Sequence, residues 1–302
     1  MLALTREEEL LRQLDADHYN PMNDVLFKFI FGKEERKQIT IDFLNAVLQQ
    51  SLGHAIADIR FDQTEKTPEN EDDKLTRLDV ACELDTGEQV DVEVQVVNEK
   101  NIQRRTLYYW AQMYLMSLPS GKKYQDLRPA ITINLLGFSV FHHEKPHSRF
   151  ILYDEVNSLR LNQDLELHFL EIPKYAEAPK KPIIRLTKME RWLAYFANQL
   201  TKEERRELAM KDEKIKDAMD AAQIFLSNKE ERRRYINREM ALMDRRSELA
   251  SAREDERDKT IIKNIQALMR KGNLSLEAAM YMLDIPEAEQ TKYAELIRKN
   301  LH

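Results

Sequence analysis

The chain has 302 residues, 47 of them basic and 53 acidic, which gives a formal net charge of −6 at pH 7. This mild acidity excludes binding to nucleic acid through bulk positive charge, so any such binding needs a local basic surface. A single cysteine, Cys82, excludes an intrachain disulfide and a cysteine-rich zinc site.

The hydropathy pattern contains no apolar run of about 20 residues, the length that a membrane-spanning helix needs. The N-terminus, MLALTREEELL, is acidic and lacks the basic and then apolar order of a secretion signal. We therefore expect a soluble, cytoplasmic protein without membrane contact. Residues 4–14 are expected to form a short helix or an ordered arm.

The first strong signal is an aromatic helix that begins near Asp24. Residues 20–24 offer a helix cap, a dense run of apolar and aromatic residues follows, and Gly32 closes the segment. Asp24 lies in the first turn, where the helix dipole favours an anion, so capping is the alternative to a role in a site. Lys28 stands one turn later, at the helical spacing that allows it to pair with Asp24. A second amphipathic helix over 34–50, a strand over 56–61 and a polar loop over 62–74 follow.

Residues 77–97, RLDVACELDTGEQVDVEVQVV, predict a β-hairpin of two half-buried strands, because apolar residues occupy every second position. The tripeptide Asp85-Thr86-Gly87 fits a three-residue loop, and Gly87 sits where such a loop needs a left-handed residue. Cys82 falls on the apolar face, which indicates a core residue rather than a nucleophile.

The loop length fixes which residues of the hairpin face each other. Leu84 opposite Glu88 brings both valine-rich sets onto one face, and it places Asp79 directly across from Glu93, with Arg77 beside Gln95. Opposed residues have Cβ atoms about 4.5–5.5 Å apart, and two carboxylates there are destabilising unless a cation lies between them. A divalent metal and Arg77 are both such cations, and a solvated acidic strand face is the alternative.

The hairpin leads into a predicted helix over 101–118. Lys100 precedes it, and Arg104, Arg105 and Tyr108 fall on its less apolar side, where the arginines could contact an anion held by the carboxylates. Surface ion pairs are the alternative for these arginines. Strands are then predicted over 130–138, buried on both faces, and over 150–155 and 165–172. The histidines between them, His142, His143 and His147, are expected to be loop residues without a metal.

The last third of the chain predicts helices. Thr187 can cap a helix over 187–199, and beyond Thr201 the sequence is rich in charge and lacks glycine until Gly272. We expect a long, self-associating helix and then two or three short helices over 261–300. Their pattern is reminiscent of a helix-turn-helix, although its middle helix lacks a basic recognition face. The predicted domains are an α/β domain over 1–200 and a charged helical region over 201–302.

Several motifs in one order, NDVLFKFIFG, RLDV, VEVQ, RRTLYYWAQMY, PAITI and LELHFLEIPK, resemble the Rpn family of recombination-promoting nucleases and putative transposases, within the PD-(D/E)xK superfamily. The resemblance covers about residues 20–200 and implies a restriction-endonuclease-like core, in which helices flank a mixed central sheet. It implies catalytic and metal-binding roles for Asp79 and Glu93, and a weaker metal position at Asp24. Gln95 stands where the superfamily usually has lysine, and Arg105 and Tyr109 match positions in the following helix.

The implied function is a Mg²⁺-dependent DNA endonuclease, with Mn²⁺ as a substitute, linked to recombination, mobile elements or defence. Low sequence preference is expected, because no base-reading motif is visible. Gln95 can orient a water but cannot carry charge, which leaves Lys100, Arg104 and Arg105 as phosphate-binding candidates. The alternative is a non-catalytic assembly protein with a self-associating tail. A nuclease that forms a homodimer through its C-terminal helices combines the two. A transposase that joins strands as well as cutting them is a third possibility, which rests on the family name alone.

Overall fold

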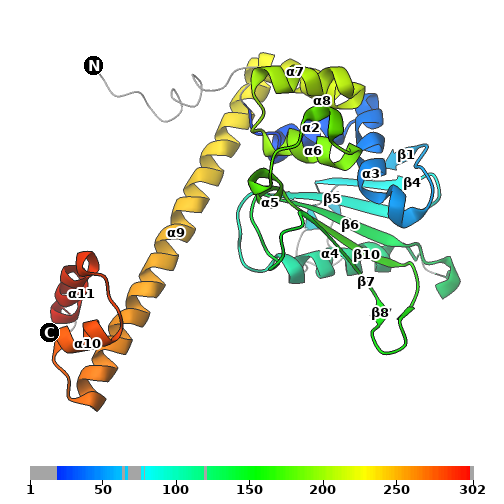
Figure 1. Cartoon of the computed structure of the whole chain (residues 1–302). Helices are drawn as coiled ribbons and strands as arrows, with labels where there is room; N and C mark the ends of the chain where they lie inside the picture. Colours follow the sequence, from blue (N-terminus) through cyan, green and yellow to red (C-terminus); the bar gives the residue numbers. More distant parts are fainter. Residues whose placement is uncertain (1–18, 63–64, 67–75, 78, 119–120, 300–302) are drawn as a thin grey trace. The chain divides into compact units, whose positions relative to one another are not determined.

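The computed structural model describes residues 19–62, 65–66, 76–77, 79–118 and 121–299. Its centre is a mixed six-stranded sheet (Figure 1). In spatial order the strands are β1 (Ile59–Phe61), β4 (Val80–Leu84), β5 (Gln89–Gln95), β6 (Ala130–Leu136), β10 (Leu165–Glu171) and β7 (His147–Ile151). The central strands β5, β6 and β10 run parallel to one another, and the three outer pairings are antiparallel.

Helices cover both faces of this sheet (Figure 1). On one face the main core packs under α2 (Asp24–Phe31), α3 (Lys37–Leu52), α6 (Lys188–Ala197) and α8 (Glu213–Ser227). On the other face α4 (Ile102–Met116) covers two smaller apolar clusters. The restriction-endonuclease-like arrangement of a mixed sheet between helices is thus confirmed.

Local signals explain where several helices begin. Asn23 caps α2 by accepting hydrogen bonds from the backbone N–H groups of Val25 and Leu26. Thr187 caps α6 in a reciprocal capping box with Glu190. Trp192 is fully buried on α6, and its ring packs against Phe31 and Phe43 of the other core helices.

Three expectations about strands need correction. The region over 62–74 is not entirely loop, because β2 (Glu65–Lys66) pairs with β3 (Thr76–Arg77), although residues 67–75 lie outside the described ones. The strand expected over 150–155 is divided between β7 and a short ribbon of β8 (Tyr153–Asp154) and β9 (Leu159–Arg160). His147 was expected in a loop, but it opens β7. The arm expected over 4–14 lies outside the described residues.

The chain forms two compact units, residues 1–240 and 241–302. The core of the first unit continues past residue 200, because α7 (Lys202–Lys211), α8 and the start of α9 (Lys229–Gly272) contribute buried side chains such as Leu208, Phe225 and Ile236. Short elements complete this unit: η1 (Glu34–Arg36), η2 (Tyr124–Asp126), α5 (Ile172–Glu177) and η3 (Ile183–Arg185).

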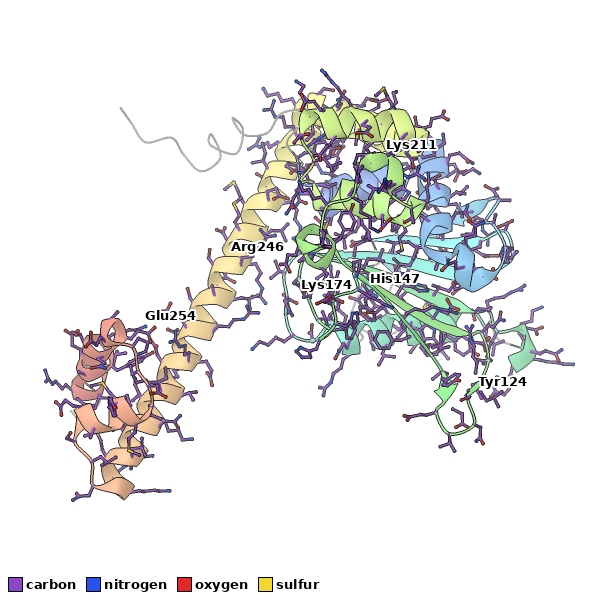
Figure 2. The ribbon with its side chains drawn as sticks, in the orientation of Figure 1. Tyr124, His147, Lys174, Lys211, Arg246 and Glu254 are labelled. Carbon is purple, nitrogen blue, oxygen red and sulfur yellow. The ribbon has the colours of Figure 1, made fainter. Side chains whose placement is uncertain are left out.

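The second unit contains the end of α9, then α10 (Leu276–Met282) and α11 (Glu287–Lys299), around a core that includes Ile265 and Tyr293. Along the middle of α9 the side chains are exposed, among them Arg246 and Glu254 (Figure 2). None of the helices within the described ranges combines the length and the apolar character that crossing a membrane requires.

Candidate active site

The hairpin adopts the predicted register. Val80 pairs with Val92 and Cys82 with Val90 across β4 and β5. Gly87 has φ of +99°, and its backbone N–H donates to the carbonyl of Leu84 at 2.9 Å, which closes the three-residue loop. The local sequence therefore sets the alignment of the two strands.

This register brings Asp79 and Glu93 together. The backbone N–H of Asp79 donates to Glu93 Oε1 at 3.2 Å, and the N–H of Val94 donates to Asp79 Oδ2 at 2.9 Å. Glu93 is only 8% exposed. The two carboxylates lie side by side at the open end of the hairpin, as the register predicted, and both are largely buried.

Among the side chains that the structure describes, Lys28 of α2 supplies a cation to this pair, with its Nζ 3.0 Å from Asp79 Oδ1. Lys28 forms this ion pair with Asp79 and not with Asp24, the partner that its helical spacing allowed. Asp24 instead accepts from Arg238 of α9, with 2.7 Å between Nε and Oδ1. Tertiary packing thus replaces the local pair with two contacts that join distant segments.

Burial shapes the electrostatics of the pair. It raises the pKa of Asp79, against the opposing effects of Lys28 and of the Val94 N–H group. Burial and the neighbouring charge of Asp79 also raise the pKa of Glu93 to about 8, against the opposing charge of Arg105. Two buried carboxyl groups side by side resist double ionisation, and an added cation would relieve that resistance.

Helix α4 covers the polar face of the hairpin, so β5 is buried on both faces rather than half-buried. Asp91, on the same face of β5 as Glu93, is fully buried. Arg105 of α4 lies 5.8 Å from the ring centroid of Tyr109 and acts electrostatically on Glu93. Burial and then the charge of Glu93 raise the pKa of Tyr109, which places this phenol near the carboxylates as well.

The other sequence candidates are less closely involved. Arg104 and Lys100 are exposed, and within the described part of the chain neither makes a polar contact to Asp79 or Glu93. Gln95 donates to the carbonyl of Val97 at 3.3 Å. Of the phosphate-binding candidates, Arg105 is therefore the one whose charge acts on Glu93.

The carboxylate pair has the chemistry of a site for a hard divalent cation, which prefers oxygen ligands. Gln95, two residues beyond Glu93 on the same face of β5, has a buried Oε1 atom without a hydrogen-bond partner among the described residues. This acceptor and the raised pKa of Glu93 both fit a bound cation or its water. No cluster of three or more potential metal-ligating side chains occurs within the described ranges, so Asp24 does not complete a three-carboxylate site there.

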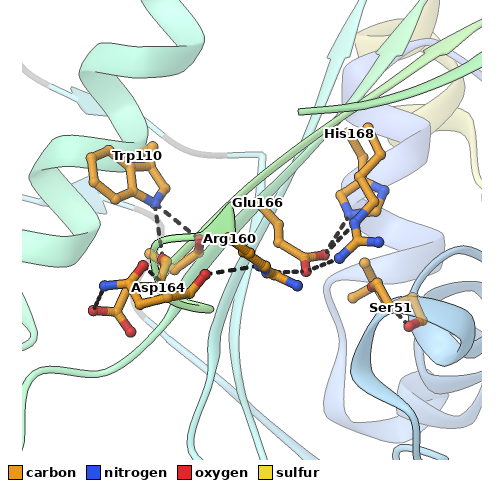
Figure 3. A network of polar contacts seen from close by, with 10 residues as sticks. Ser51, Trp110, Arg160, Asp164, Glu166 and His168 are labelled. Atoms are coloured by element: carbon orange, nitrogen blue, oxygen red, sulfur yellow. Dashed lines mark hydrogen bonds and ion pairs between the residues drawn. The ribbon is translucent and has the colours of Figure 1, made fainter. Parts of the chain in front are cut away.

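A second polar network lies on the opposite face of the sheet, on β10 and β7 (Figure 3). Burial alone would raise the pKa of Glu166, but hydrogen bonds from His168, Arg149 and Arg160 hold that pKa well below its usual range. His147 Nε2 lies 2.9 Å from His168 Nδ1. Because both carboxylate oxygens of Glu166 already face a guanidinium or an imidazole group, we interpret this network as structural.

Comparison with known protein families matches residues 21–252 to the PD-(D/E)XK nuclease family transposase. The match spans most of the chain and confirms the resemblance noted from the motifs. The chain belongs to the PD-(D/E)XK nuclease family transposases. None of the curated proteins and none of the solved structures matches it.

In this PD-(D/E)XK nuclease family transposase, sequence reasoning missed one residue of the site, Lys28. Its spacing from Asp24 suggested a local ion pair, and this spacing offered no reason to look for a second partner such as Asp79. A signal was nevertheless present, because Gln95 at the usual lysine position leaves the site in need of a cation from elsewhere. Cys82 is buried as expected, and burial raises the pKa of its thiol to about 12, which opposes nucleophilic chemistry.

Proposed function

We propose that this protein is a metal-dependent endonuclease that hydrolyses DNA phosphodiester bonds. The observation that carries the proposal is the buried pair of Asp79 and Glu93, with Lys28 in contact and Arg105 in electrostatic range. In phosphoryl transfer, carboxylates can hold a metal ion, and cationic side chains neutralise the negative charge that develops on the phosphate. This site has two residues of each kind. The family match, to nuclease-type transposases, supports the same activity.

Asp79 and Glu93 would hold the cation, which we propose to be Mg²⁺ with Mn²⁺ as a substitute. When bound, such a cation polarises the phosphate and lowers the pKa of a coordinated water. The carboxylates must both be ionised for this, and Lys28 favours the ionised form of Asp79.

The remaining residues have roles set by their chemistry. Lys28 supplies the positive charge that Gln95 cannot, and Arg105 adds a second charge from α4. The amide of Gln95 can accept from a water and orient it. No base-reading element accompanies these groups in the sequence, so we expect cleavage with little sequence preference.

A plasmid assay tests the proposal. Supercoiled DNA is incubated with the protein and Mg²⁺ or Mn²⁺, and nicked and linear products are quantified. Asp79→Asn and Glu93→Gln keep size and shape but remove charge, and each is expected to lower the rate at least about 100-fold. Glu83→Gln is a matched control, since Glu83 lies on the same hairpin and pairs at the surface with Arg60. Equal nicking by all four proteins, or nicking that survives EDTA, would refute the proposal.

A second candidate function is assembly through the C-terminal helices, with the nuclease as a homodimer. It is supported by two large exposed side chains on α10, Tyr281 at 82% and Met282 at 62% exposure. Sedimentation velocity of the full chain and of Tyr281→Lys with Met282→Lys tests it. A dimer that the double substitution dissociates is the expected result, and a wild-type monomer across micromolar concentrations would contradict it.

A further inference from the structure

The position of Lys28 depends on how α2 is held, and the two ends of this short helix are held differently. Its C-terminal half is fixed by aromatic packing, in which Phe27 and Phe31 stack at 4.5 Å between ring centroids and both contact Phe196. Its N-terminal turn is held by polar contacts with the first turns of α9. Lys28 stands between Phe27 and Phe31 and one turn after Asp24, so its place depends on how the whole helix is held.

Asn23 connects α2 to α9 through a fully buried side chain. Its Oδ1 atom caps α2, while its Nδ2 donates to Glu239 Oε1 at 2.8 Å and to the carbonyl of Tyr235 at 3.4 Å. Asn20 adds two contacts to the same residues of α9: its N–H donates to the Tyr235 hydroxyl at 2.7 Å, and its amide donates to Glu239 at 3.1 Å. The first turn of α2 is therefore attached to α9 at several points.

Arg238 adds a charged contact to this attachment, because its guanidinium pairs with Asp24 in the first turn of α2. Lys28 stands four residues after Asp24, the spacing at which a helix favours an acid–base pair. Asp24 also lies close enough to Asp79 to act on it electrostatically, so a second acid stands near the amine that Asp79 binds. With Arg238 on Asp24 at 2.7 Å, Lys28 contacts Asp79 at 3.0 Å.

We propose that Arg238 is a positioning residue of the nuclease site: by pairing with Asp24 it leaves Lys28 to Asp79. This inference rests on the proposed function for its effect on catalysis, but the pairing itself can be measured without any activity. Arg238 contacts neither carboxylate of the pair in the described structure, so it acts through Lys28. The site thus depends on a residue 214 positions away from the acid it binds.

The test without catalysis is a double-mutant cycle. Lys28→Met and Asp79→Asn, singly and together, are placed in the wild-type and Arg238→Gln backgrounds of the full chain, and urea unfolding is followed by tryptophan fluorescence. We expect the coupling between Lys28 and Asp79 to fall to less than half in the Arg238→Gln background. Arg238→Lys, which keeps the charge, is expected to restore it. Unchanged coupling in Arg238→Gln would overturn the proposal, whether or not the protein cleaves DNA.

The test with catalysis uses plasmid cleavage. Arg238→Gln is expected to lower kcat about tenfold with little change in KM, because a displaced cation affects the reacting groups more than DNA binding. Arg234→Gln is the matched control, since this exposed arginine one turn earlier on α9 pairs with Glu231 of its own helix. If Arg238→Gln and Arg234→Gln cleave alike while wild type is active, the proposal is wrong. If wild type is inactive, the proposed function fails and the coupling measurement alone decides.

Discussion

Replacement of Lys28 by methionine is the sharpest test of how the site is built. The substitution keeps most of the apolar stem and removes the amine, so Asp79 loses the cation 3.0 Å from its Oδ1 atom. At an effective dielectric constant of about 20, two unit charges at this separation attract by about 5 kcal/mol. That figure is an upper bound, because desolvation and screening offset much of it.

The solvent exposure of the two side chains determines how much this ion pair contributes to stability. The side chain of Asp79 is 12% exposed and that of Lys28 is 33% exposed, so the pair lies between a surface bridge and a buried one. Surface pairs contribute about 0–1 kcal/mol, whereas breaking a buried pair costs about 3–5 kcal/mol. We therefore expect Lys28→Met to lower the free energy of unfolding by about 2 kcal/mol at pH 7 without added metal.

The assay is urea unfolding in EDTA, followed by fluorescence of Trp110 and Trp192, which are the two tryptophans of the chain and report only on residues 1–240. Lys37→Met is a matched control, because Lys37 pairs at the surface with Glu34 and Asp58; we expect it to cost less than about 1 kcal/mol. Equal losses for Lys28→Met and Lys37→Met would refute the reasoning about a partly buried pair.

Two further predictions concern buried polar groups. Burial, and then the charges of His168 and Arg149, lower the pKa of His147 to about 4. As pH falls, His147 therefore becomes protonated in the unfolded chain before it does so in the folded protein. The free energy of unfolding is thus highest above about pH 6.5 and decreases towards pH 4. We expect His147→Gln to remove about 1.5 kcal/mol of the loss between pH 7 and 5 in urea titrations, with the exposed His142→Gln unchanged from wild type. Thr106→Val should cost about 1–2 kcal/mol, because Thr106 donates to Asn134 Oδ1 at 2.9 Å in a buried position. Thr132→Val is its control and should be neutral or stabilising, since the buried Thr132 hydroxyl has no partner among the described residues; the reverse order of the two would contradict this argument.

The hairpin and its acid pair could be predicted because everything that aligns them lies within about 20 consecutive residues. Alternating valines fix which face is buried, and the loop around Gly87 fixes which residues are opposed. The capped starts of α2 and α6 were predictable for the same reason, since a cap depends on a residue and the next three N–H groups.

Burial of the polar face of the hairpin could not be predicted from its own pattern. Alternation shows that the two faces differ, and it is silent on whether another element covers the polar one. Helix α4 does so, and the resulting burial raises the pKa of Glu93 to about 8. The same acid on a solvated strand face would have no such shift.

The choice of ion-pair partners was decided only by the tertiary structure. Sequence spacing by itself determined that Asp79 would face Glu93, because a short loop leaves one sterically sensible alignment. It favoured an equally local pair of Asp24 with Lys28. In the folded protein Asp24 instead contacts Arg238 at 2.7 Å, and Lys28 contacts Asp79 at 3.0 Å. Backbone register is a property of neighbouring residues, whereas a long, flexible side chain pairs with whichever opposite charge packing places nearest.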